Sequence, residues 1–334
     1  MRILIISDAW HPQVNGVVVT LAMLVQELSA LGHDIEVIGP DRFRTVSMPT
    51  YSSIRLAVTP ARRLVPMIEA FRPEALHIAT EGPLGWAARR WAIYHGVRFT
   101  TSFHTRFPEY LHARARVPLG LSYAFMRGFH GRAQGTMVAT GSLRRELAGR
   151  GFRNLLPWSR GVDLQKFSPH DREDWPWPRP IFLYVGRLAV EKNLERFLSL
   201  DLPGTKVVVG DGPQRGALEA AYPAAHFVGE RHGPALTRAY AGADVFVFPS
   251  VTDTFGLVLL ESLACGTPIA ALPVTGPADI LAGAAPGVGA LDHDLRAAAM
   301  LALQGDRGAC RAHAERFSWR ACAELFFTNL TRTA

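Results

Sequence analysis

The stretch RILIISDAWHPQVNGVVVTLAMLVQELSALGHDIEVIG, residues 2–39, decides the fold class. It begins with the apolar run RILIIS (2–7), which predicts a buried parallel strand. After a loop, residues 17–31 predict a helix that stops at Gly32. DIEVIG (34–39) predicts a second strand. The chain therefore opens as a strand–helix–strand unit.

The same alternation continues and restarts once. In the rest of the first half we expect strands at 54–58, 75–79, 98–103, 136–140 and 154–159. The helices expected there lie at 61–71, 84–95 and 142–150, and helical segments follow the strand 98–103 and end near residue 132. In the second half we expect strands at 181–186, 206–210, 226–229, 244–250, 268–272 and 288–291, and helices at 191–200, 213–221, 234–242, 256–264, 294–304, 307–317 and 319–330. This pattern predicts mostly parallel sheets with helices on both faces.

The segment SPHDREDWPWPRP (168–180) separates the two halves, because its prolines, tryptophans and charges suit neither a strand nor a helix. We expect an N-terminal domain at 1–167, this linker, a C-terminal domain at 181–318, and a helix at 319–334 that packs back on the N-terminal domain. A chain of 334 residues is long enough for two domains. The predicted fold class is α/β, with two doubly wound, Rossmann-like domains facing a cleft. Ligands of such sheets bind at the carboxyl ends of strands.

Charge is distributed unevenly along the chain. Residues 1–168 carry 21 basic against 11 acidic side chains, whereas residues 169–334 carry 15 against 18. The region 89–160 holds 13 arginines and only two acidic residues. A basic half favours an anionic partner, such as nucleic acid, anionic lipid or a phosphorylated substrate. Arginine also outnumbers lysine 33 to 3, as in GC-rich genomes, so arginine content alone decides little.

Other compositional features exclude several classes of protein. No run of about 18 uncharged apolar residues predicts a membrane span. The N-terminus lacks the pattern of a signal peptide, so a cytoplasmic location is expected. Three scattered cysteines predict neither a disulfide framework nor a zinc site.

The strongest local motif is TDTFGLVLLESLACGTPIA (252–270), which follows a predicted strand. Gly256 allows the backbone to approach a ligand, and the first N–H groups of the following helix suit a diphosphate. Asp253 precedes the helix and is either its N-cap or a ligand-binding carboxylate. Glu261 is either solvated or paired, since a carboxylate on an otherwise apolar helix needs partners, and ribose hydroxyls would serve. The ligand-contacting residues predicted here are Thr254, Phe255, Gly256, Leu257 and Glu261.

Three further positions carry chemistry or have simpler explanations. In VGRLAVEKNLERF (185–197), Arg187 and Lys192 can direct two cations at a diphosphate leaving group, or they can be ordinary surface cations. His104 ends the strand of TTSFHT and is either a ligand-binding or a structural histidine. Gly16 lies in the first strand–helix loop, where a glycine can also serve only the turn.

Two apparent motifs fail. VVGDGPQRG (208–216) has the wrong glycine spacing for a dinucleotide loop. LDHD (291–294) contains an Asp-x-Asp pair that could clamp Mg²⁺, but its place before a late helix indicates a turn and an N-cap. No metal site is therefore predicted.

Together these residues resemble a retaining glycosyltransferase of the GT-B fold in family 4, over nearly the whole chain. Gly16 in PQVNGV matches the family's diphosphate-contacting glycine, and His104 matches its sugar-contacting histidine. RGVDLQKFSP (160–169) resembles the junction between the family's domains. Arg187 and Lys192 match the phosphate-binding pair. The family signature is Glu, seven residues, Glu; here it reads Asp253, seven residues, Glu261.

The resemblance implies roles for these residues. The first acid, here one methylene shorter, faces the hydroxyls of the transferred sugar, so the change bears on which sugar is accepted. Glu261 binds the donor ribose, and the base lies near Val228. His104, Arg187, Lys192 and Asp253 form the catalytic set. The donor is a nucleotide-diphosphosugar, which is a substrate, and no cofactor or metal is required.

TDTFG and SFHTRFPEY resemble the branch that makes glucosyl-, glucuronosyl- or sulfoquinovosyl-diacylglycerols. The expected reaction is retaining transfer from UDP-glucose or UDP-glucuronate to diacylglycerol. Related mannosyltransferases share these segments, so the alternative is a GDP-mannose-dependent α-mannosyltransferase acting on a lipid or polysaccharide. A remoter alternative is a non-catalytic sugar-nucleotide or nucleic-acid binding protein, and the paired carboxylates argue against nucleic acid as a partner.

A lipid acceptor requires the enzyme to reach a membrane. Residues 109–132 mix apolar side chains with Arg114, Arg116, Arg127 and Arg132. This composition predicts an interfacial helix on the inner face of an anionic membrane, within the basic region 89–160. The alternative is that the apolar residues are core and the arginines only a solvated face.

Overall fold

The computed structural model describes residues 1–13, 15–48, 51–58 and 60–333. Its contacts divide the chain into unit 1, Met1–Arg160 with Trp319–Ala334, and unit 2, Gly161–Ser318. Each unit contains a six-stranded sheet in which neighbouring strands run parallel. The predicted pair of parallel α/β sheets is confirmed.

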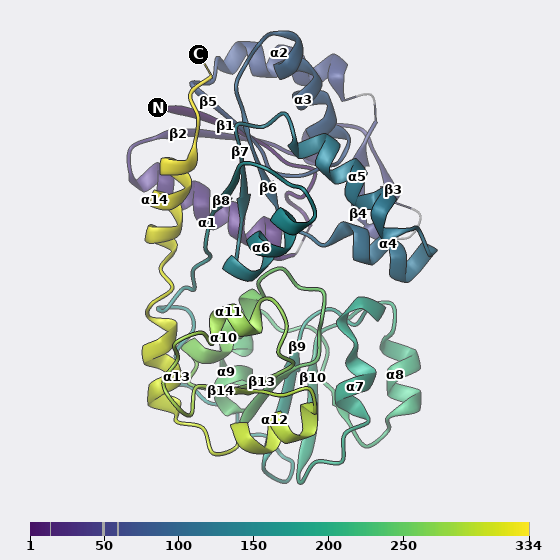
Figure 1. The fold of residues 1–334 in the computed structure, drawn as a ribbon. Coiled ribbons are helices and arrows are strands. Elements are labelled where there is room, and N and C mark those ends of the chain that lie inside the picture. Colours follow the sequence, from purple (N-terminus) through teal and green to yellow (C-terminus); the bar gives the residue numbers. More distant parts are fainter. Residues whose placement is uncertain (14, 49–50, 59, 334) are drawn as a thin grey trace. The chain divides into compact units, whose positions relative to one another are not determined.

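In unit 1 the strand order across the sheet is β2-β1-β5-β6-β7-β8, and helices cover the sheet (Figure 1). The strands are β1 (Arg2–Ile6), β2 (Asp34–Ile38), β5 (Ala75–Ile78), β6 (Thr100–Phe103), β7 (Gly135–Val138) and β8 (Leu155–Pro157). The helices are α1 (Gly16–Ala30), α2 (Ala61–Phe71), α3 (Pro83–Tyr94), α4 (Phe107–Ala115), α5 (Leu119–His130), α6 (Gly141–Gly149) and α14 (Trp319–Asn329). The apolar residues of β1 are fully buried, as expected for a strand covered on both faces.

Local chemistry explains why α1 forms despite three consecutive valines. The Asn15 side-chain oxygen accepts hydrogen bonds from the N–H groups of Val17 and Val18, each at 3.0 Å. This cap satisfies donors that the first turn leaves unpaired. Leu21, Leu24 and Leu28 then place a buried stripe on one face, and packing offsets the low helix propensity of the β-branched start.

The strand expected at 54–58 is part of a separate hairpin. β3 (Thr45–Met48) pairs antiparallel with β4 (Tyr51–Ala57), outside the six-stranded sheet. Sequence analysis missed β3, because TVSM is short and mixes polar and apolar residues. Its pairing with β4 makes it a strand, whereas its composition does not predict one.

In unit 2 the strand order is β11-β10-β9-β12-β13-β14. The strands are β9 (Ile181–Val185), β10 (Thr205–Val209), β11 (His226–Phe227), β12 (Val245–Phe248), β13 (Ile269–Ala271) and β14 (Gly289–Leu291). The helices are α7 (Leu194–Leu198), α8 (Arg215–Ala221), α9 (Gly233–Gly242), α10 (Leu257–Ala264), α11 (Pro277–Ile280), α12 (Leu295–Ala302) and α13 (Arg307–Ala314). The chain extends the sheet from β9 to β11, then returns to place β12 on the other side of β9. The order therefore reverses between β9 and β12, which makes this the topological switch point.

The units meet in sequence at 160/161, seven residues before the expected boundary at 167. Residues 168–180, expected as a linker, belong to unit 2. The Glu173 N–H donates to the Arg238 carbonyl at 3.0 Å, and Trp175 is buried. Trp177 stacks on His226 with ring centroids 3.9 Å apart. These contacts join residues that are far apart in the sequence, and local composition does not reveal them. The proline content of the segment therefore suggests a linker, although the segment packs on unit 2.

The C-terminal segment returns to unit 1, where α14 packs against α1 (Figure 1). Phe327 stacks on His33 at 4.3 Å between ring centroids, and Phe326 lies 5.0 Å from the Trp158 ring. Beyond the helix, the Thr333 N–H donates to the Glu74 carbonyl at 2.9 Å. Unit 1 is therefore completed by residues from both ends of the chain.

Candidate functional site

Two loops of unit 2 lie side by side at its switch point. One follows β9 and runs through residues 186–193, and the other follows β12 and runs through 249–256. Asn193 Nδ2 donates to the Pro249 carbonyl at 3.3 Å, and Thr252 Oγ1 donates to the Glu191 carbonyl at 3.1 Å. Parallel doubly wound sheets bind ligands at this edge and at this point of the strand order.

An ion pair joins the two loops. Lys192 Nζ donates to Asp253 Oδ1 at 2.5 Å, and the two side chains are 21% and 18% exposed. Asp253 Oδ2 is buried and accepts no hydrogen bond from the residues that the structure describes. The structure thus brings together two of the predicted site residues. It also leaves one buried carboxylate oxygen without a hydrogen bond from the described residues.

The N-cap of α10 is Gly256, so the N-cap alternative for Asp253 is wrong. Gly256 has φ 93°, a left-handed conformation that favours glycine, and no side chain of the described residues caps the helix. The Leu259 N–H donates to the Gly256 carbonyl at 3.0 Å, and the N–H groups of the first turn are not taken up by a side-chain cap from the described residues. Phe255 is buried, whereas Thr254 and Leu257 are half-buried.

A second glycine shapes the same segment. Gly276 has φ 95°, and a Cβ there would lie 2.6 Å from the Phe255 carbonyl oxygen. The loop after β13 therefore presses against the backbone of the TDTFG motif. Arg187 is half-buried on the opposite loop, and its carbonyl accepts a hydrogen bond from the Tyr184 hydroxyl at 3.1 Å. The loop after β9 and the loop after β12 are thus each held in place by a contact to the backbone.

Glu261 is half-buried and paired, so the solvated alternative is wrong. The Tyr240 hydroxyl, from the neighbouring helix α9, donates to Glu261 Oε2 at 2.9 Å. Burial raises the pKa of Glu261 above its ordinary value, and the bond from Tyr240 and the charge of Lys166 oppose that rise. Sequence analysis missed Tyr240, because no spacing rule links a tyrosine on one helix to a carboxylate on the next.

Two predicted site residues belong to unit 1. His104 follows β6 and is 8% exposed, and Arg160 Nη2 lies 3.3 Å from its Nδ1. Burial and then the Arg160 charge lower the pKa of His104 well below its ordinary value. Gly16 is the first residue of α1 and is exposed, while Val14 of the same motif lies outside the described residues. Arg160 is the second residue that sequence analysis missed.

Val228 follows β11 at the outer edge of the sheet. Its N–H donates to the Val208 carbonyl at 3.0 Å. The glycines of GDG nearby serve packing: a Cβ at Gly210 would lie 1.9 Å from the Gly186 oxygen. One at Gly212 would lie 2.4 Å from the Leu188 oxygen. These glycines are needed because two backbone segments come close together here. This packing role agrees with the conclusion that GDG is not a dinucleotide motif.

The LDHD segment is a turn and a cap, as predicted. Asp292 Oδ1 accepts from the Asp294 N–H at 2.8 Å, and Asp294 caps α12 by accepting from the Arg296 N–H at 2.9 Å. Among the described residues, no group of three or more His, Cys, Asp or Glu side chains is arranged to hold a metal ion. The three cysteines are buried and free.

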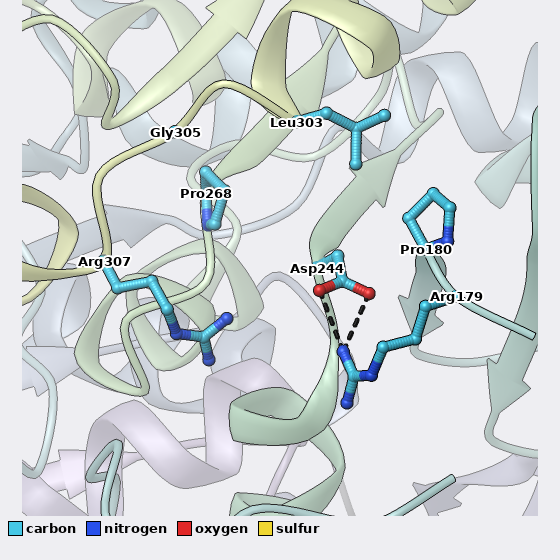
Figure 2. Close-up of a pocket in the computed structure, with 7 residues that line it drawn as sticks. All are labelled: Arg179, Pro180, Asp244, Pro268, Leu303, Gly305 and Arg307. Carbon is cyan, nitrogen blue, oxygen red and sulfur yellow. Dashed lines mark hydrogen bonds and ion pairs between the residues drawn. The ribbon is translucent and has the colours of Figure 1, made fainter. Parts of the chain in front are cut away.

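An open pocket of about 400 Å³ lies at the other end of the unit 2 sheet, beside the starts of β9, β12 and β13 (Figure 2). Arg179 Nη1 donates to both carboxylate oxygens of Asp244 there, at 2.8 and 2.9 Å. Arg307 Nη1 donates to the Ala243 carbonyl at 2.9 Å. These arginines tie strand ends together, and the pocket is separate from the switch-point loops.

Comparison with known proteins matches both halves of the chain. The model of Glycosyltransferase Family 4 matches residues 14–166, and that of Glycosyl transferases group 1 matches residues 179–306. A GDP-mannose-dependent alpha-mannosyltransferase of Mycolicibacterium smegmatis is 33% identical over 311 residues, which span 84% of this chain and 82% of that protein.

Two further similarities cover nearly the whole chain. A GDP-mannose-dependent alpha-(1-6)-phosphatidylinositol dimannoside mannosyltransferase of Mycobacterium tuberculosis is 30% identical, covering 98% of this chain and 96% of that protein. The solved structure of sucrose-phosphate synthase from Thermosynechococcus elongatus superposes with a TM-score of 0.77 at 19% identity, covering 98% of this chain and 97% of that one. At that identity the structural match speaks for the fold alone.

Proposed function

We propose that this chain, which belongs to glycosyltransferase family 4 and is a retaining hexosyltransferase of the GT-B fold, transfers mannose from GDP-mannose to a lipid acceptor. Two relatives carry GDP-mannose in their names, and one of them also names a phosphatidylinositol-based lipid. This supports the mannosyltransferase alternative better than the first expectation of UDP-glucose or UDP-glucuronate with diacylglycerol.

The observation that carries the transferase chemistry of the proposal is the Lys192–Asp253 pair across the two switch-point loops, whereas the choice of donor and acceptor rests on the names of the relatives. Lys192, Arg187 and the N–H groups at the start of α10 stabilise the negative charge that grows on the departing diphosphate. Asp253 accepts a hydrogen bond from a hydroxyl of the sugar through its buried Oδ2. Because cations and a helix terminus neutralise the diphosphate, the reaction needs no metal.

The remaining roles rest on the family resemblance. Glu261 accepts hydrogen bonds from the donor ribose hydroxyls, and Tyr240 orients it. Val228 lies near the base. In unit 1, Gly16 serves the diphosphate and His104 the transferred sugar. The acceptor oxygen attacks the anomeric carbon on the face from which the diphosphate leaves, the bond to the diphosphate breaks, and the departing phosphate takes the acceptor proton.

The acceptor implies a membrane surface, for which we propose α5 of unit 1. No helix among the described residues is long and apolar enough to cross a bilayer. On α5, Leu121 and Phe125 are 66% and 50% exposed, one turn apart. Exposed Arg116 and Arg132 flank them, and the side chain of Arg114 lies outside the described residues. These features suit an anionic interface.

Part of the expected membrane surface is core. Tyr123, Met126 and Phe129 of the same segment are buried. Tyr123 donates to Glu109 Oε1 at 2.6 Å, and Phe129 packs in the core with helix α3. We therefore limit the proposed interfacial face to the outer side of α5, because the core alternative is confirmed for Tyr123, Met126 and Phe129.

A donor panel tests the proposal. The protein is incubated with GDP-mannose, UDP-glucose or UDP-glucuronate and a lipid extract, and lipid products are identified by mass spectrometry. We expect a hexose-bearing lipid with GDP-mannose and little with the uridine donors. A product only with a uridine donor would restore the first expectation. Donor binding without transfer or hydrolysis would support the non-catalytic alternative.

A further inference from the structure

The environment of His104 has a feature that the sequence motifs do not contain. Arg160 follows strand β8 and is 4% exposed. Its Nη1 donates to the carbonyls of Trp158 and Ser159, at 2.7 and 2.9 Å. Its Nη2 lies 3.3 Å from His104 Nδ1, and its guanidinium carbon lies 4.2 Å from the centre of the Trp158 ring. Four contacts thus hold one guanidinium in place beside the histidine.

The chemistry of this contact determines which histidine nitrogen carries the proton. A guanidinium group has N–H donors and no lone pair to accept with, so Arg160 can only donate. His104 Nδ1 must therefore accept, and it carries no hydrogen. The single N–H of the neutral ring is then on Nε2. Protonating Nδ1 would break this bond and set two N–H groups and two positive charges against each other.

We propose that Arg160 is a positioning residue that holds His104 as the neutral tautomer protonated on Nε2, so that His104 meets the sugar as a hydrogen-bond donor and not as a base. The role toward the sugar rests on the proposed function. The tautomer itself does not, because the contact lies wholly within unit 1.

Other titratable side chains surround the His104–Arg160 pair. The other groups facing this pair are His77 on β5, His130 on α5 and Cys322 on α14. Glu81 lies 3.1 Å from His130 Nε2, and both nitrogens of His77 are bonded, to Thr100 and Ser102. Among the described residues, no carboxylate forms an ion pair with Arg160. Its charge therefore acts on His104 without a neutralising partner.

Imidazole nitrogen NMR on the full chain, labelled with ¹⁵N-histidine, tests the tautomer without any sugar nucleotide. The His104 signals are assigned by their loss in His104→Gln. We expect an unprotonated Nδ1 and a protonated Nε2 from about pH 5.5 to 8, the range in which an ordinary histidine titrates. A proton on Nδ1 anywhere in this range would overturn the proposal.

Variants of Arg160 separate positioning from a purely structural role. Arg160→Met keeps the length and loses the donor, so the His104 signals should shift toward a mixture of tautomers and titrate at higher pH. Arg160→Lys keeps a cationic donor and should retain the Nε2 tautomer. If the methionine variant does not fold, the tautomer measured in Arg160→Lys still tests the proposal. Arg153→Met, at an exposed site of the same unit, is the matched control. Unchanged His104 signals in folded Arg160→Met, or loss of the tautomer in folded Arg160→Lys, would refute the role of Arg160.

Kinetics connect the tautomer to the reaction. Arg160→Met should lower kcat by roughly 10- to 100-fold with little change in donor KM, because a misplaced donor weakens the transition state more than the ground state. An unchanged kcat would overturn the claim that Arg160 positions His104 as a hydrogen-bond donor to the sugar. If the spectra show the tautomer but no donor is turned over, the proposed function fails and the tautomer assignment stands.

Discussion

Replacing Glu261 by glutamine should improve or preserve stability while weakening donor binding. Burial raises the pKa of Glu261 in the folded protein, so the ionised side chain costs the folded state free energy at neutral pH. For a carboxyl group whose folded pKa is raised, stability is highest below the unfolded pKa and falls as pH rises through the folded pKa. Glutamine is neutral throughout and keeps an oxygen that accepts the bond from Tyr240.

The effect on donor binding has the opposite sign and can be sized. A hydrogen bond to a charged group contributes about 1.5–3 kcal/mol, and one between neutral groups about 0.5–1.5 kcal/mol. Removing the charge of Glu261 weakens its hydrogen bonds from two ribose hydroxyls. We therefore expect a loss of about 2 kcal/mol in binding free energy, which corresponds to an increase of about 30-fold in the dissociation constant of GDP. Glutamine is preferred to alanine, because alanine leaves the buried Tyr240 hydroxyl without an acceptor.

Two measurements check this prediction. Urea denaturation at about pH 5 and pH 8 should show Glu261→Gln at least as stable as the parent at pH 8, with the difference shrinking at pH 5. Calorimetric titration with GDP should show the weaker affinity. Glu195→Gln, at an exposed position of α7, is the control that removes one charge elsewhere in unit 2. A variant that binds GDP normally but has lost stability at pH 8 would show that Glu261 is structural.

Three further predictions follow from the same site and from α5. Arg187→Ala or Lys192→Ala should lower kcat more than donor affinity, since both cations act on charge that grows in the transition state; an effect on affinity alone would reduce them to binding groups. Chelators should leave transfer unchanged, and activity lost in EDTA and restored by Mg²⁺ or Mn²⁺ would contradict the proposed charge neutralisation. Vesicles containing phosphatidylglycerol should bind the protein at low salt, and Arg116→Glu with Phe125→Ser should weaken that binding; equal binding to neutral vesicles would favour a soluble acceptor.

The sequence predicted what depends on neighbours along the chain. The apolar run of β1 and the alternation of strands and helices identify two parallel α/β sheets, because burial on both faces of a central strand demands apolar residues at nearly every position. The strand that ends in FPS and the following TDTFG segment likewise mark a strand–loop–helix turn, and the structure has it there. Strand β3 of the hairpin was not predicted, because its four residues form no apolar run.

What pairs with each functional side chain was decided by tertiary structure. Lys192 and Asp253 are 61 residues apart, His104 and Arg160 are 56 apart, and Glu261 and Tyr240 are 21 apart. The first pair meets because the sheet order sets β9 beside β12, and the second because segments after β6 and β8 reach the same edge of unit 1. Residue type and spacing indicate that a buried charge needs a partner, but strand order and helix packing determine which residue supplies it.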